Sequence, residues 1–199
     1  MLFKKQISIM AWLLAFSSLA KAGVLIEPYL GYEATKHSMT FTTGNIEAPG
    51  AITGTGYGLR LGYKLPVMFW AALDAGMGTG KLKFDTTGTI ADSDVSRNTL
   101  GLTAGIDLPI LLRFWVGTGF SDQMQIKTST TSDTFKGSHT KVGLGFTALP
   151  FLSINAEYIM RKYTDGSGDL VTAGGGYANY LTKLEGSTVL ISVSAPFNF

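Results

Sequence analysis

Two histidines, His37 and His139, are the side chains of this 199-residue sequence that are best suited to act as general bases near neutral pH. Hydrolysis of the serine-hydrolase kind needs a nucleophilic serine, a histidine base and an orienting acid within hydrogen-bond reach. His37 is followed by Ser38, and His139 stands between Ser138 and Thr140. Neither neighbourhood supplies a complete set of partners. We therefore predict no catalytic residue, with His37 in a loop and His139 at the outer end of a strand.

Carboxylates also occur at spacings that could bind calcium. Asp92-Ser93-Asp94 and Asp165-Gly166-Ser167-Gly168-Asp169 have such spacings, but neither contains the full ligand pattern of a calcium loop. The glycines of Gly174-Gly175-Gly176 lack the lysine and the strand-to-helix context of a phosphate loop. We predict no metal and no cofactor. The tyrosines that follow, Tyr177 and Tyr180, could instead anchor a ligand of the loop.

A larger group of charged residues stands inside segments that are otherwise apolar or small. Its members share one phase of a two-residue repeat, so β-strands would place them on one face. They are Glu27, Arg60, Asp74, Asp107, Arg113, Lys141, Glu157 and Arg161. Four are acidic and four are basic, so their formal charges sum to zero. Such a face could form either a paired network or the lining of a pore.

The elements that carry these charges have the period of β-strands. After residue 23 no stretch is suited to a transmembrane helix, whereas apolar residues recur at every second position. In the first run, Ile26 and Leu30 alternate with Glu27 and Glu33. Similar runs cover about residues 24–34, 56–63, 69–77, 99–108, 112–120, 141–148, 154–161 and 188–199. Eight strands with two different faces are therefore predicted.

Three copies of a short motif that contains Leu-Pro separate these runs. They are Leu65-Pro66-Val67-Met68-Phe69, Leu108-Pro109-Ile110-Leu111-Leu112 and Leu149-Pro150-Phe151-Leu152, spaced 43 and 41 residues apart. Proline fixes φ and has no N–H group, so it belongs in a tight connection rather than within a strand ladder. The motifs therefore predict three short hairpin turns.

The other connections are longer and polar, and they cover about residues 35–53, 80–97, 121–138 and 164–185. Short turns at one end and long loops at the other are typical of outer-membrane barrels, whose short turns face the periplasm. The apolar alternation continues into residues 81–84 and 124–127. This continuation predicts that some strands extend beyond the membrane and that these loops are partly stiff hairpins.

The N-terminal segment has the features of a secretory signal peptide. Lys4-Lys5 precedes an apolar run over residues 7–16, and Ala20-Lys21-Ala22 supplies small residues before a cleavage site. The apolar run is shorter than the ~20 residues that a membrane-spanning helix needs. We predict a signal peptide at residues 1–22 and a mature domain at residues 23–199. Cleavage leaves 13 basic and 14 acidic side chains, which gives no support for nucleic-acid binding.

The C-terminus alternates apolar and small polar residues from Ser192 to the terminal Phe199. Together with the signal peptide, the Leu-Pro turns and Ile26-Glu27-Pro28-Tyr29-Leu30-Gly31-Tyr32, this ending resembles the small eight-stranded outer-membrane barrels, the OmpA-like and OmpX-like group. The resemblance implies an all-β fold, an eight-stranded antiparallel up-and-down transmembrane β-barrel. It also implies a monomer in the bacterial outer membrane, in contact with membrane lipid and lipopolysaccharide. Phe199 would be the insertion signal that the barrel-insertion machinery reads.

The charged face would then lie inside a narrow barrel. An eight-stranded lumen is just wide enough to be filled by side chains, and buried charges must be paired. The turn register predicts Asp107 opposite Arg113. The same register predicts two diagonal pairs, Arg60 with Asp74 and Lys141 with Glu157. We expect a plug, with a wet pore through the same charges as the alternative; His139 would face Arg161.

Outward aromatic residues are predicted to form two girdles at the membrane interfaces. They are Tyr63, Phe69, Phe151, Phe197 and Phe199 near the periplasmic ends, and Tyr32, Tyr57, Phe120 and Tyr158 near the other rim. A soluble carrier barrel would reverse this polarity and place apolar residues inside. The inward charges argue against that alternative.

The resemblance leaves the activity open, because one fold can serve several functions. A structural or surface-interaction role, with an unknown ligand for the loops, is the first hypothesis. A narrow porin-like channel is the second, and a lipid A-modifying enzyme is the third. The lipid A deacylase family has a His-x-Ser pair on a strand, whereas here the residue two positions after His139 is Lys141. The enzyme hypothesis therefore lacks its nucleophile.

Overall fold

A computed structural model describes residues 22–66, 68–84, 93–149 and 151–199. The predicted signal peptide falls almost wholly outside these residues. The described residues form eight long strands: β1 (Gly23–Phe41), β2 (Ile46–Lys64), β3 (Phe69–Phe84), β4 (Ser93–Asp107), β5 (Leu112–Lys127), β6 (Ser132–Leu149), β7 (Leu152–Gly168) and β8 (Leu181–Ser194). Short elements complete the fold: a 3-10 turn at Thr43–Asn45, helices α2 (Asp169–Ala173) and α3 (Tyr177–Tyr180), and strand β9 (Phe197–Asn198).

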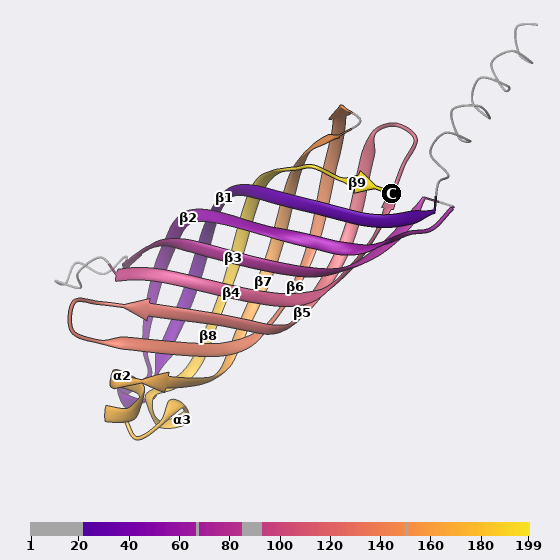
Figure 1. Ribbon diagram of the computed structural model, residues 1–199. Coiled ribbons are helices and arrows are strands. Elements are labelled where there is room, and N and C mark those ends of the chain that lie inside the picture. The colour runs from indigo at the N-terminus through magenta and orange to yellow at the C-terminus, as the bar shows by residue number, and fades with distance from the viewer. Residues whose placement is uncertain (1–21, 67, 85–92, 150) are drawn as a thin grey trace, which may run out of the picture.

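The strands close into a barrel in which each pairs antiparallel with its sequence neighbours, as predicted (Figure 1). Closure comes from β1, which pairs with β2 on one side and with β8 on the other. Pro196 cannot donate to the ladder, and β9 resumes pairing with β1 just beyond it. Phe199 and Val24 exchange two backbone hydrogen bonds of 2.9 and 3.0 Å. The pairing of β1 with β8 closes the ring, so the backbone groups of the paired strands are satisfied within the sheet, as a bilayer requires.

The strands are longer than a bilayer needs. They contain 14 to 19 residues, whereas a tilted transmembrane strand needs about 9–11. The predicted loop at 35–53 is therefore mostly wrong, because Phe41 still pairs with Ile46 and only the short turn between them leaves the ladder. The strand extensions expected at residues 81–84 and 124–127 are confirmed. At the end of the barrel opposite the short turns, the strands therefore continue beyond the length that crosses a bilayer.

The side chains alternate as an outer-membrane barrel requires. Large apolar residues such as Leu30, Leu102 and Val116 are exposed on the outside, while Glu27 and Arg60 are fully buried inside. The nine aromatic residues expected at the interfaces are all on the exposed surface. This polarity is the reverse of that of a soluble carrier barrel. The outer surface is suited to lipid and the interior to polar packing.

One β-bulge changes which residues face the interior. Leu100 pairs with Ser121 but Gly101 pairs with Gly119, so Phe120 is an extra residue in β5. An extra residue shifts the two-residue repeat by one position. Asp122 therefore points inward, and its side chain is buried. Strict alternation would place this aspartate on the outer surface.

Inward glycines make room for the large side chains of the interior. A Cβ atom on Gly143 would lie 2.1 Å from Cε2 of Trp115, whose ring is itself buried. A Cβ atom on Gly56 would have its nearest contact, Cδ1 of Leu190, at 3.4 Å. The two glycines are both inward strand residues, but of the two only Gly143 would bring its added Cβ atom against the ring of a buried tryptophan.

We expect Gly143→Ala to lower the free energy of unfolding by about 1–3 kcal/mol, because overpacking forces a side chain or the backbone to shift. Gly56→Ala is the matched control and should change stability little. Urea unfolding of protein folded into lipid vesicles, followed by tryptophan fluorescence, measures both. Equal losses for the two variants would contradict the packing argument.

Candidate functional site: the charged interior of the barrel

Arg60 on β2 is the centre of the charged interior. Its guanidinium group contacts three carboxylates, and its side chain is fully buried. Nε donates to Oδ2 of Asp74 at 3.0 Å and Nη1 donates to Oε1 of Glu27 at 3.2 Å. Nη2 donates to Glu157 across the lumen. The planar, permanently charged fork of arginine suits such a junction, because its donors point in several fixed directions.

Arg113 on β5 extends the network toward the short turns. It forms a bidentate pair with Glu27, with N–O distances of 2.8 and 3.0 Å. Its Nε donates to Oδ1 of Asp107 at 2.9 Å, and Nζ of Lys64 binds the other oxygen of Asp107 at 2.7 Å. Bidentate charge-assisted pairs are the stronger class of hydrogen bond. The ion pairs of Arg113 and Lys64 together connect the side chains of β1, β2, β4 and β5.

Lys141 on β6 closes the network on the opposite side. Its Nζ lies 2.5 Å from Oδ2 of Asp74 and 3.0 Å from Oε2 of Glu157. Tyr29 donates to the second oxygen of Asp74 at 3.0 Å. Seven of the eight charged residues predicted for the lumen thus lie in one continuous cluster. Arg161, the eighth, lies in a separate layer nearer the loops.

Aromatic rings pack against the arginines of this cluster. The Cζ atom of Arg60 lies 4.9 Å from the ring centre of Tyr29 and 4.8 Å from that of Trp115. Cζ of Arg113 lies 5.2 Å from the ring centre of Trp70. A cation above an aromatic face is attracted by the ring quadrupole, more strongly where water is excluded. The two buried tryptophans therefore support the charges as well as filling space.

The second charged layer lies nearer the loops and is centred on Asp122. Its carboxylate accepts hydrogen bonds from Arg161, from Nδ1 of His139 at 3.0 Å and from the hydroxyl of Tyr163 at 3.1 Å. Beside it, Nη1 of Arg97 donates to Oε1 of Glu33 at 2.9 Å.

The histidines are placed differently from the prediction. His139 lies within strand β6 rather than at its outer end, and its side chain is buried in the lumen. It pairs with Arg161 across the ladder, as expected. His37 lies within strand β1 rather than in a loop, and it is also buried. Asp122 and His139 form an acid–base pair, and among the hydrogen bonds of the described residues the partner of the His139 ring is this aspartate rather than a serine. In the same part of the chain no cluster of His, Cys, Asp and Glu could hold a metal ion.

The predicted pairings of the lumen are largely correct. Asp107 lies opposite Arg113, and Lys141 is diagonal to Glu157. Arg60, however, lies directly opposite Asp74 rather than diagonal to it. The first two turns have the same geometry: the backbone N–H of Leu65 donates to the carbonyl of Phe69, and that of Leu108 to the carbonyl of Leu112, each at 2.7 Å. The first hairpin therefore pairs Arg60 directly with Asp74, just as the second pairs Asp107 directly with Arg113.

Sequence reasoning missed four members of the interior charge set, for different reasons. Glu33 and Lys64 continue the inward phase of their strands and could have been included. Arg97 falls in a segment predicted to be a loop, and Asp122 is turned inward by the bulge. With them, the ion-paired interior of the described residues contains six acidic and six basic side chains: Glu27, Glu33, Asp74, Asp107, Asp122, Glu157, Arg60, Lys64, Arg97, Arg113, Lys141 and Arg161. The charge balance is therefore retained.

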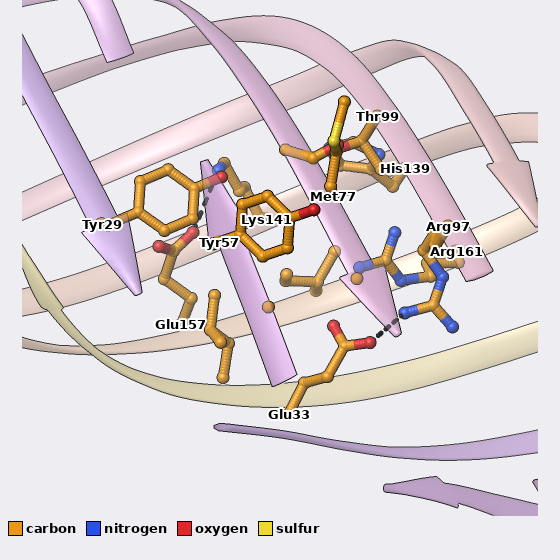
Figure 2. A pocket seen from close by; sticks show the side chains of 15 residues that line it. Tyr29, Glu33, Tyr57, Met77, Arg97, Thr99, His139, Lys141, Glu157 and Arg161 are labelled. Atoms are coloured by element: carbon orange, nitrogen blue, oxygen red, sulfur yellow. Dashed lines mark hydrogen bonds and ion pairs between the residues drawn. The ribbon is translucent and has the colours of Figure 1, made fainter. Parts of the chain in front are cut away.

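A small cavity separates the two charged layers. Its volume is about 30 Å³, and Tyr29, Glu33, Arg97, His139 and Lys141 are among the residues that line it. Figure 2 shows Glu33 paired with Arg97 on one side and Lys141 near Glu157 on the other. A space of this size holds roughly two water molecules, which need polar partners of the kind found here. Water in this cavity can hydrate the charges without opening a wide passage through the lumen.

The outer end of the lumen is filled by apolar side chains. A buried cluster there includes Met39, Ile52, Leu82, Val95, Met124, Phe135, Tyr163, Val171, Leu181 and Leu184. Helices α2 and α3 lie across this end of the barrel, opposite the C-terminus (Figure 1). Oδ1 of Asp133 accepts the backbone N–H groups of Leu170 and Val171 at 3.0 and 3.1 Å, which satisfies the start of α2.

The tyrosines of this cap are held by the barrel. The ring of Tyr180 packs on Phe41 and that of Tyr177 on Phe135, with centroid distances of 5.5 and 6.4 Å. The Tyr177 hydroxyl donates to the carbonyl of Tyr163 at 2.8 Å. Burial, with a smaller contribution from Asp165, raises the pKa of Tyr177, so the hydroxyl remains a donor at neutral pH. These rings are thus partly used for packing and are not freely projecting anchors.

The closed antiparallel barrel, with its apolar exterior and charged interior, defines an integral β-barrel of the bacterial outer-membrane class. Solved structures with this fold are similar over most of the chain. Ail of Yersinia pestis, solved with the heparin analogue sucrose octasulfate, is 11% identical with a TM-score of 0.56, over 88% of this chain and 99% of Ail. OprG of Pseudomonas aeruginosa is 15% identical with a TM-score of 0.56, over 90% and 98%. AlkL in lipid bilayers is 14% identical with a TM-score of 0.53, over 89% and 91%.

These identities are low, so the likeness establishes the fold and no more. No protein-family model matches the sequence, and no curated protein matches it significantly. What the interior does must therefore be argued from its own residues.

Loss of the central arginine should be costly. We expect Arg60→Gln to lower the free energy of unfolding by about 3–5 kcal/mol, because three buried carboxylates lose a shared cation. Lys81→Gln, which alters an exposed pair with Asp94, should cost no more than about 1 kcal/mol. Urea unfolding in lipid vesicles compares the two variants. Similar small losses would show that the network does not stabilise the barrel.

Proposed function

We propose that this protein is a closed outer-membrane barrel that acts at the cell surface and does not conduct solutes. The observation that supports the proposal is the filling of the lumen at three levels. Paired charges occupy the part near the short turns, a second charged layer follows, and an apolar cluster lies below α2 and α3. Opening a path would require breaking buried ion pairs, which is costly when one partner remains unpaired.

The proposal includes the membrane contacts expected from the sequence. The nine exposed aromatic residues would form the interfacial girdles, and the apolar belt between them would contact lipid. Phe199, whose side chain is exposed while its backbone pairs with Val24, would present the insertion signal. Lipopolysaccharide would surround the outer half of a monomeric barrel. The complex of Ail with a sulfated saccharide supports a surface role for this fold.

Planar bilayer recordings test the closed interior. We expect no steady channels from purified wild-type protein. Arg60→Ala combined with Arg113→Ala should conduct and favour cations, because it removes two large side chains and leaves carboxylates without partners. Lys83→Ala combined with Lys127→Ala, which removes two exposed lysines, should stay silent.

Large, steady wild-type channels would contradict the proposal and favour a porin-like channel, with the cavity between the charged layers as part of its path. The altered mobility of an unboiled, folded barrel on gel electrophoresis confirms that each variant has folded before it is recorded.

Lipid A enzymology is tested separately. The buried side chain of His139 is bonded to Asp122 in the lumen, so it is poorly placed to reach an ester of a lipid on the outer surface of the barrel. We expect the lipid A mass spectrum of cells to be the same with the wild-type protein, with His139→Ala and with an empty vector. A mass shift that appears with wild-type protein and disappears with His139→Ala would establish an enzyme.

A further inference from the structure

A polar groove opens on the outer surface where β7 and β8 part. The two strands stay paired up to Tyr163 and Leu184, after which β7 continues along β6 while the chain forms α2 and α3. The groove has a volume of about 410 Å³. It is lined mainly by Lys162, Thr164, Tyr177, Thr182, Lys183 and Glu185. The groove therefore results from the fold, since a continuous ladder would close it.

The lining combines cations, hydroxyl groups and one carboxylate. Nζ of Lys183 lies 3.0 Å from Oε2 of Glu185, and both side chains are about half exposed. Lys162 lies across the ladder from Glu185 but forms no ion pair within the described part of the chain. Because Glu185 can neutralise only one of the two lysines, the groove keeps a net positive charge. The ring of Tyr177 forms its border toward the loops.

The height of the groove relative to the membrane is fixed by the register. One outward step along β7 from Lys162 toward the short turns is the exposed Met160, and the next is Tyr158 of the predicted outer girdle. On β8 the apolar surface begins at Val189. Successive outward residues are about 7 Å apart along a strand. Lys162 therefore lies one outward step, about 7 Å along the strand, beyond Met160. Lys183 lies three outward steps, about 20 Å, beyond Val189, so the groove extends outward from the edge of the lipid-facing belt.

Two further lysines stand on the strands beside this groove. Lys36 on β1 and Lys136 on β6 are exposed, and each lies close in register to the groove strands. Asp165 opposes Lys136 and reduces its contribution. The face formed by β6, β7, β8 and β1 therefore carries four exposed lysines around the groove, against the carboxylates of Glu185 and Asp165.

We propose that this groove binds the phosphorylated sugar headgroup of an outer-leaflet lipopolysaccharide. Lys162 and Lys183 would bind phosphate, which lysine recognises as a point charge. The hydroxyls of Thr164 and Thr182 and the carboxylate of Glu185 would bind sugar hydroxyls. A lipid-anchored sugar suits the site better than a free one, because Lys162 lies one outward step beyond the apolar belt and Lys183 lies farther out, in the direction in which the sugars of such a lipid extend. This inference rests on the proposed orientation of the protein in the outer membrane.

Native mass spectrometry of the full mature protein in detergent tests the site. The probe is deep-rough lipopolysaccharide, compared with the same material after phosphatase treatment and with phosphatidylglycerol. We expect Lys162→Gln combined with Lys183→Gln to weaken lipopolysaccharide binding by roughly 30-fold, at about 1 kcal/mol for each lysine. The matched control, Lys83→Gln with Lys127→Gln, removes the same charge elsewhere and should bind as wild type. Lys162→Arg with Lys183→Arg should retain binding.

Three results would overturn the proposal. They are equal losses in the groove and control variants, undiminished binding of the phosphatase-treated lipid, and equal affinity for phosphatidylglycerol. The last result would indicate a general attraction to anionic surfaces. Gel mobility of the unboiled protein shows that each variant is folded. Channel recordings report on the lumen and this assay on the outer wall, so failure of one proposal is distinguishable from failure of the other.

Discussion

Inside a closed eight-stranded barrel, every charge must have a partner, because the lumen holds little water and its walls are apolar outside. Arg60 meets this constraint by contacting three carboxylates from three strands. Those carboxylates bind Arg113 and Lys141 in turn, so the pairs form a cluster rather than isolated bridges. Removal of one member leaves several others short of a partner, which couples the strands through their interior as well as through the ladder.

Packing around the charges follows from the same constraint. Arginine and tryptophan side chains are large, and the lumen can hold them only where a neighbouring strand carries glycine, as at Gly143 on β6, which pairs directly with Trp115 on β5. The rings then exclude water from the guanidinium groups and contact their faces. Small and large inward residues are therefore complementary between neighbouring strands.

The part of the barrel beyond the membrane is stabilised mainly by apolar packing rather than by ion pairs. The interior there is apolar, as in a soluble core, and α2 and α3 cover it. This arrangement gives the long hairpins a stiff base and leaves β7 and β8 apart at their outer ends, which creates the groove on the wall. The strands thus separate an interior of paired charges and apolar side chains from the exposed side chains of the groove.

Period-two patterning, the Leu-Pro turns and the C-terminal alternation were enough to predict the strand number, the closed antiparallel order and most inward charges. Alternation has local causes, since a strand directs neighbouring side chains to opposite faces. The inward turn of Asp122, the burial of His37 and the direct pairing of Arg60 with Asp74 depended on the tertiary structure. A bulge or a turn register is set by how two strands fit together, and a one-residue shift reverses every face that follows. The sequence by itself therefore determined the barrel and its polarity, whereas only the tertiary structure decided which charges meet and where the outer wall opens.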